Sequence, residues 1–204
     1  MDALTSPVVE WSAAERAFDG GGESGDRYLV KPYAHGALVA VADGLGHGPD
    51  AAVAARTAME ILEADADLPI TTLLQRCHEH LRPTRGAALT LAVFDGRQET
   101  MTWLGVGSVD GVVLRAPPAC GSQRLVLRAG LVGCQLPSLH PSVIQVAPGD
   151  TLVLVTDGIR DDFAEQLTPD GPVGSSADRI LARHAKGTDD ALVLVVRYRG
   201  GGGG

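Results

Sequence analysis

The stretch ALVAVADGLGHGPDAAVAARTAMEIL, residues 37–62, joins an apolar run to a helix-like segment through an acid and three glycines. Residues 37–42 are continuously apolar, which predicts a strand buried on both faces. From Pro49 to about Ala66 the pattern predicts a helix, because proline suits a first helical turn and apolar residues recur at helical spacing. The predicted apolar face of that helix comprises Ala52, Val53, Ala55, Met59 and Leu62.

Asp43 thus ends a predicted strand, and the glycine-rich segment DGLGHG that follows has two interpretations. It is a tight turn, in which glycines supply positive φ and the aspartate caps the helix. Alternatively, the glycines let the backbone approach a metal or phosphate, so that a carboxylate and a main-chain carbonyl face one ion. The segment alone does not decide between them.

Composition restricts the class of protein. The chain has 204 residues, of which 45% are hydrophobic, so residues 1–199 can form a single domain, and residues 200–204 are expected to be a disordered glycine tail. The net charge of −8, with basic residues scattered singly, excludes nucleic acid as an expected partner. No run is long enough to cross a membrane and the start has no leader pattern, so we expect a soluble cytoplasmic protein with no membrane contact.

The remaining pattern predicts strands at 8–17 and 27–31, a helix at 70–81, and then a mostly antiparallel meander. The meander comprises AALTLAVF, ETMTWLGVG, VDGVVLR, QRLVLR, SVIQVA and TLVLVT, and it precedes a helix at 175–185 and a last strand, ALVLVVRY. This order argues against alternating βαβ units. We expect an α/β (α+β) fold, a four-layer αββα sandwich of two mainly antiparallel sheets flanked by helices.

Four acids lie beside predicted apolar strands: Asp26, Asp43, Asp157 and Asp189. Half-buried carboxylates that converge repel one another unless a cation neutralises them. Oxygen ligands select hard ions such as Mg²⁺ or Mn²⁺, and two such ions can share one carboxylate. The alternative is four unrelated turn acids, since Asp-Gly is a common turn dipeptide.

Several motifs occur in a familiar order: SGD, AVADGLGHG before an alanine-rich helix, RGAALTLAVF, PGDTLVLVTDGI and a final DD before an apolar strand. With these the chain resembles the metal-dependent serine/threonine protein phosphatases of type 2C, in the short bacterial subgroup related to sporulation protein E. The resemblance covers nearly the whole chain. Within that subgroup, the compact length and the stretch CGSQRLVLRAGLVGCQLP look most like the stressosome phosphatases.

The resemblance implies a site for two Mn²⁺ or Mg²⁺ ions. Asp43 would bridge the two ions, and Asp157 and Asp189 would complete the first. Asp26 and the main-chain carbonyl of Gly44 would bind the second. In this family a metal-bridging hydroxide attacks phosphorus in phosphoserine or phosphothreonine, so Asp43 and Asp157 would act in catalysis through the metals.

The chain departs from the family pattern at the positions of the general acid and the third metal. Leu45 stands where longer members carry a histidine, so His47 becomes the candidate general acid, although the pattern favours a solvent-facing turn histidine and metal-bound water could supply the proton. Ser108 stands where some relatives have an aspartate for a third metal, which argues against a third ion, and Asp161 keeps an acid used there.

Two further roles are only partly assigned. The arginine that holds the substrate phosphate in the family has no clear counterpart, and the candidates are Arg16, Arg27 and Arg160. Asp190, which follows Asp189, is expected to support the site or cap a strand rather than to bind a metal.

By resemblance, the substrate would be a phosphorylated STAS-domain protein of a stressosome or anti-sigma-factor pathway, and we expect the phosphatase to be a monomer. One alternative is a catalytically silent module on the same fold that sequesters a signalling partner. Another is a metal phosphohydrolase for a nucleotide or small ester, which no P-loop, aromatic stacking motif or basic pocket supports.

Overall fold

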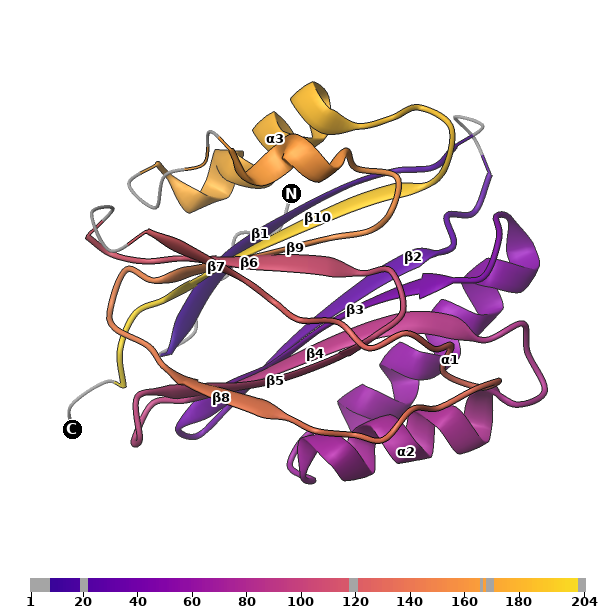
Figure 1. Ribbon diagram of the computed structural model, residues 1–204, viewed down its shortest axis with the longest axis horizontal. Coiled ribbons are helices and arrows are strands. Elements are labelled where there is room, and N and C mark those ends of the chain that lie inside the picture. The colour runs from indigo at the N-terminus through magenta and orange to yellow at the C-terminus, as the bar shows by residue number, and fades with distance from the viewer. Residues whose placement is uncertain (1–7, 19–21, 118–120, 166, 168–170, 202–204) are drawn as a thin grey trace.

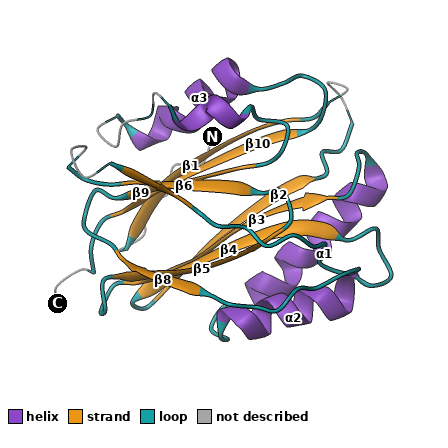
Figure 2. Cartoon of the chain, viewed as in Figure 1, coloured by secondary structure: helices purple, strands orange, loops and turns teal. Residues whose placement is uncertain are grey.

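The chain folds into four layers in the computed structural model, which describes residues 8–18, 22–117, 121–165, 167 and 171–201. Among these residues two β-sheets face each other, with two helices outside one sheet and one helix outside the other, an arrangement that Figure 1 shows. The helices are α1 (Pro49–Ala64), α2 (Ile70–Leu81) and α3 (Ser176–His184). Figure 2 shows the same layers by element type, and they confirm the predicted αββα sandwich.

Each sheet has five strands, and all neighbouring strands are antiparallel. The first sheet, on the α3 side, has the order β1 (Val9–Arg16), β10 (Ala191–Tyr198), β9 (Thr151–Val155), β6 (Asp110–Leu114), β7 (Ser122–Arg124). The second, on the side of α1 and α2, has the order β2 (Asp26–Tyr33), β3 (Gly36–Gly44), β4 (Ala87–Asp95), β5 (Thr100–Val106), β8 (Ser142–Gln145).

The expected meander is therefore corrected in one respect. The strands after residue 86 do not follow one another in a single sheet, because the chain crosses to the first sheet after β5 and returns to the second for β8. The strand predicted for QRLVLR is also wrong beyond Arg124, where β7 ends. From Leu125 the main chain instead runs past the second sheet, where the Arg128 N–H donates to the Gly105 carbonyl at 3.0 Å.

Most other boundaries agree with the sequence pattern. The helix at 70–81 and the last strand have the predicted limits. The strand predicted for 37–42 extends through Asp43 and Gly44, so the acid lies within the strand rather than after it. Val53 does not belong to the buried face of α1, because its exposed fraction is 43%. The described residues also include the short 3-10 turns η2 (Asp161–Ala164) and η3 (Val173–Ser175).

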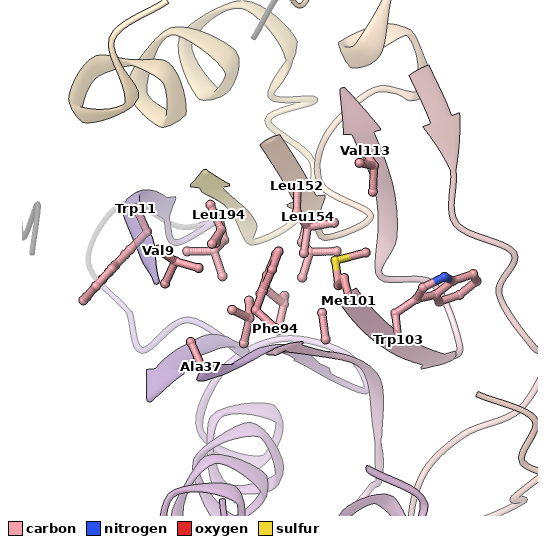
Figure 3. Close-up of a cluster of buried hydrophobic side chains, with 14 of the residues drawn as sticks. Val9, Trp11, Ala37, Phe94, Met101, Trp103, Val113, Leu152, Leu154 and Leu194 are labelled. Atoms are coloured by element: carbon pink, nitrogen blue, oxygen red, sulfur yellow. The ribbon is translucent and has the colours of Figure 1, made fainter. Parts of the chain in front are cut away.

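The apolar layer between the two sheets is built by strict alternation along the strands. Every second side chain of β3, β9 and β10 enters it, and Figure 3 shows labelled members from both sheets pointing toward one another. The labelled residues are Val9, Trp11, Ala37, Phe94, Met101, Trp103, Val113, Leu152, Leu154 and Leu194.

The intervening residues face the helices. On the second sheet, Leu38, Ala40 and Ala42 pack against a helix face that is rich in alanine on α1 and in leucine on α2. Small side chains let α1 lie close to the strands, and the leucines of α2 fill the remaining space. No helix in the described part of the chain is long and apolar enough to cross a membrane. Of the predicted glycine tail, residues 202–204 lie outside the described residues, and Gly201 lies against Gly96.

Candidate metal centre

Alternation along the strands places two of the predicted acids opposite each other. Asp26 opens β2 and pairs in register with Asp43, next to last in β3. Val39 and Val41 enter the layer between the sheets, so Asp43, two residues further along, has the same orientation. Asp26 likewise continues the series of Tyr28 and Val30. Both carboxylates therefore end the apolar layer.

Burial and mutual repulsion act strongly on this pair. Asp26 is 1% exposed. Burial is the main cause that raises the pKa of Asp26 to about 8, and the neighbouring Asp43 adds to it. The pKa of Asp43 is raised to about 7, again chiefly by burial and then by Asp157 and Asp189. The two carboxyls hold protons at pH values where exposed carboxyls are ionised.

Asp157 and Asp189 reach the same end of the fold from the first sheet. Asp157 follows β9 by two residues, and Asp189 precedes β10 by two. The pKa of Asp157 is raised by its partial burial and by Asp189, and lowered by Lys186. Because Asp157 is exposed, the group of carboxylates opens to solvent on its side. The structure thus brings the four predicted acids together.

Two residues hold Asp26 and the segment before it in place. Thr156, which the sequence analysis did not single out, donates from Oγ1 to Asp26 Oδ2 at 2.7 Å and accepts the Leu192 N–H at 2.9 Å. Asp190 accepts the N–H groups of Phe18 at 2.8 Å and Gly25 at 2.7 Å, one on each carboxylate oxygen. Asp190 thus fixes the backbone at Phe18 and Gly25, and its expected role in supporting the site stays a prediction. Thr156 could have been found by alternation, because it follows Leu152 and Leu154 at period two.

The glycines of DGLGHG have different roles. Gly46 and Gly48 have φ of +88° and +79°, so these two provide the predicted tight turn. The cap of α1 is Gly48, without a side-chain hydrogen bond, so the predicted capping by Asp43 is wrong. A Cβ on Gly44 would collide with the carbonyl oxygen of Ala51, so glycine here lets α1 pack against the strand.

The departures from the family pattern lie close to Asp43. Leu45 is 52% exposed, and the ring of His47 lies 6.0 Å from that of Phe18. His47 is exposed, and its role as general acid stays a prediction. Ser108 donates from Oγ to Asp43 Oδ2 at 3.3 Å, so a hydroxyl contacts the acid at that position.

Among the described contacts, none of the candidate phosphate-holding arginines forms a hydrogen bond with the side chain of a predicted acid ligand. The guanidinium of Arg27 binds the carbonyls of Ser24 and Asp26 at 2.9 and 2.7 Å. Arg160 binds Asp162 at 3.4 Å and the Arg183 carbonyl beside α3. Arg16, exposed at the end of β1, pairs in register with Ala191.

Asp161, the acid expected near a third metal, begins η2. It does not contribute to the raised pKa of Asp43 or Asp157. Lys186, by contrast, lies at the site: its Nζ donates to the main-chain carbonyl of Asp157 at 2.6 Å. The sequence pattern gave no signal for Lys186.

The candidate ligand atoms are chemically suited to a hard divalent cation. All candidate ligands are oxygens, and the described side-chain hydrogen-bond partners of Asp26 and Asp43 are hydroxyls rather than cations. Among the described residues, no three His, Cys, Asp or Glu side chains already surround one point. The acids therefore share one end of the sandwich. To bind one ion together, their side chains must move toward a common point.

Comparison with known proteins identifies the family of the chain. The family model described as stage II sporulation protein E matches residues 34–199. Phosphoserine phosphatase RsbX of Bacillus subtilis (strain 168) is 26% identical over 137 residues, which are 67% of this chain and 67% of that protein.

Two solved structures share the fold across nearly the full chain. One comes from work on "The bacterial stressosome: a modular system that has been adapted to control secondary messenger signaling"; it is 30% identical, covers 93% of this chain and 99% of its own, and has a TM-score of 0.83. The other, RsbX in complex with magnesium, is 19% identical, covers 97% and 98%, and has a TM-score of 0.86.

Proposed function

The chain belongs to the stage II sporulation protein E family, and on that premise we propose that it removes phosphate from phosphoserine or phosphothreonine on a folded signalling protein. It is a metal-dependent serine/threonine phosphatase of type 2C. The further proposal is that two ions, Mn²⁺ or Mg²⁺, bind at the acidic end of the sandwich. Their ligands would be Asp26, Asp43, the Gly44 carbonyl, Asp157 and Asp189.

The observation that carries the proposal is the pair of the buried Asp26 and the half-buried Asp43. Two carboxyls directly opposite each other, with pKa values raised to about 8 and 7, are costly to ionise without a positive partner. Their described side-chain partners are the hydroxyls of Thr156 and Ser108. A pair kept at this cost, at the end of an otherwise apolar layer, is suited to bind cations.

Divalent cations bound there would lower the pKa of an attacking water and neutralise the phosphoryl oxygens. The protein's own groups prepare the site. Thr156 fixes one oxygen of Asp26, and Ser108 contacts one oxygen of Asp43, so within the described part of the chain the second oxygen of each carboxylate forms no side-chain hydrogen bond. Lys186 holds the Asp157 main chain and favours the ionised form of the Asp157 carboxyl.

The proposed substrate is a phosphorylated STAS-domain protein of a stressosome or anti-sigma-factor pathway, and the proposed enzyme is a monomer in the cytoplasm. Similarity to RsbX and to a structure from work on the bacterial stressosome supports this substrate class. Recognition of a whole protein surface predicts that short phosphopeptides are hydrolysed much more slowly than the folded partner. Equal rates on both would contradict that expectation.

The test is Mn²⁺-dependent hydrolysis of p-nitrophenyl phosphate by wild type and by Asp43→Asn, with circular dichroism to check folding. The exposed Asp178 offers a matched control, Asp178→Asn. We expect turnover to fall by at least about 100-fold in Asp43→Asn, because loss of a bridging ligand removes metal-assisted stabilisation of the transition state. If the folded wild type neither turns over the ester nor binds Mn²⁺ in calorimetry, the chain is a silent binding module instead.

A further inference from the structure

Exposed apolar side chains gather around the turn that follows Asp43. Among the described residues, six large hydrophobic side chains are exposed, and three of these lie at or next to this turn. They are Phe18, Leu45 and Val53, with exposed fractions of 46%, 52% and 43%. Single exposed hydrophobic residues need no explanation, but a group beside a reaction centre indicates a binding surface.

Two of these side chains are held from different parts of the fold. The Phe18 N–H donates to Asp190, the residue after the predicted ligand Asp189, and the Phe18 ring lies beside His47 of the turn. The Leu45 N–H donates to the Gly86 carbonyl at 3.0 Å, at the start of β4. The Phe18 backbone is thus fixed beside a predicted ligand and the Leu45 backbone to the strand that pairs with β3, while both side chains remain open to solvent.

An arginine completes this surface. Arg85 Nη2 donates to Asp50 Oδ2 at 2.7 Å, and the two side chains are 52% and 68% exposed. Arg85 Nη1 lies 3.3 Å from the position that a Cβ on Gly46 would occupy, so the guanidinium lies beside the turn. An exposed pair of this kind is weak, and a guanidinium has five N–H donors, so Arg85 can also bind an anionic group of a partner.

The position next to the metal centre determines what covers this surface. A phosphoserine phosphate lies only a few covalent bonds, on the order of 5 Å, from the backbone that carries it. A phosphoprotein whose phosphate reaches Asp43 must therefore bring its own backbone against the adjoining turn. A standard interface covers about 800 Å² on each partner, enough to include Phe18, Leu45 and Arg85.

We propose that Phe18, Leu45, His47 and Arg85 form a docking surface for a folded STAS-domain phosphoprotein. This inference rests on the proposed function. Phe18 and Leu45 form its apolar centre, and Arg85 pairs with a carboxylate of the partner at its edge. Val53, one helical turn after Asp50, extends the surface along α1. Specificity for a protein then comes from this surface, and the reaction comes from the acids beside it.

The experiment compares kcat/KM for Phe18→Ala, Leu45→Ala and Arg85→Ala on three substrates in Mn²⁺. These are a STAS-domain protein phosphorylated on serine, a short phosphopeptide with the same phosphoserine, and p-nitrophenyl phosphate. Val143→Ala is the matched control, because Val143 is 62% exposed on the edge strand β8. We expect the ratio of phosphoprotein to phosphopeptide kcat/KM to fall about tenfold in each variant, mainly through KM, and to stay at the wild-type value in the control.

Each other outcome overturns a defined part of the proposal. An unchanged ratio in all three variants would exclude this surface from docking. An equal loss on all three substrates would mean that the residues act on the metal centre. Wild-type turnover of p-nitrophenyl phosphate without turnover of the phosphoprotein would exclude the STAS-domain partner. A wild type inactive on all substrates would instead refute the proposed function.

Discussion

The layer between the two sheets has an apolar middle and an acidic end, and the same strands build both. Along β3, Val39 and Val41 enter the layer, and the next residue in the series is Asp43. Along β9 and β10 the series of leucines and valine leads to Thr156 and Asp190. The site is therefore the core pattern continued with polar residues at one end.

The comparison shows how the two regions differ in what stabilises them. The middle is stabilised by burial of apolar area, about 25 cal/mol per Å², and needs no partner of defined charge. The end contains carboxyls whose burial destabilises their charged form. Four measurements can separate these contributions, and each uses the unfolding free energy.

The largest effect should be the pH dependence of stability in a chelator. The pKa values of Asp26 and Asp43 are raised to about 8 and about 7 in the folded state, whereas unfolded carboxyls titrate near 4. The folded state therefore retains protons, and its stability is complete below about pH 4 and is lost as pH rises through 7 to 8. We expect a loss on the order of 5 kcal/mol between pH 4 and pH 9 in urea denaturation.

Saturating Mn²⁺ should reverse the sign of this pH dependence, so that stability rises with pH. The reason is that a metal binds the deprotonated carboxylates and stabilises the folded state. Asp43→Asn should reduce the pH dependence measured in chelator. A metal-free stability that does not change over this range would refute the description of Asp26 and Asp43 as carboxyls whose pKa values are raised in the folded state.

In the apolar middle, Leu154→Ala should lower the unfolding free energy by about 3 kcal/mol, because it removes most of a fully buried side chain and leaves a cavity. Calorimetry should show little change in Mn²⁺ affinity while the variant remains folded. If Mn²⁺ affinity falls together with the unfolding free energy, the apolar middle and the acidic end do not act independently.

Asp190→Ala should have the next largest effect and lower the unfolding free energy by about 2 kcal/mol, because one buried and one part-buried N–H group lose their acceptor. Because those groups position the segment before Asp26, we also expect Mn²⁺ affinity to fall. Asp178→Ala, on the exposed face of α3, is the matched control for both measurements. Retention of full metal affinity in Asp190→Ala would limit Asp190 to a structural role.

The smallest effect is expected for Thr156→Val, which should lower the unfolding free energy by about 1 kcal/mol at pH 5. The variant loses one hydroxyl that both donates and accepts a hydrogen bond. Without that donor the pKa of Asp26 should rise further, which NMR titration in chelator can measure. Thr156→Ser keeps the hydroxyl and should behave as wild type. An unchanged Asp26 pKa in the valine variant would rule out Thr156 as its positioning partner.

The sequence pattern predicted the layers and most elements because helical and strand periods are local properties. It could not predict which sheet each strand after residue 86 joins, since that depends on long-range pairing such as β1 with β10. Val53 shows the same limit: its helical spacing suited the buried face, but α1 contacts the sheet through its alanines.

For the candidate site, the positions of the four acids were predictable from the strand ends and from the resemblance. Thr156 was predictable in principle from its place in the alternating series. Lys186 and Arg85 were not, because their relation to the site depends on contacts across 29 residues for Lys186 and 35 residues for Arg85. No local pattern encodes such distances.

The pairing of β1 with β10 also governs when the protein can work during synthesis. The first sheet needs its earliest and latest strands side by side, and Asp26 meets Thr156 across 130 residues. On the ribosome β2, β3, β4 and β5 can pair as they emerge, because each neighbour follows the last in the chain. The acids from both sheets meet only after β10 has left the exit tunnel, so a nascent chain acquires its reactive centre no earlier than the emergence of that strand.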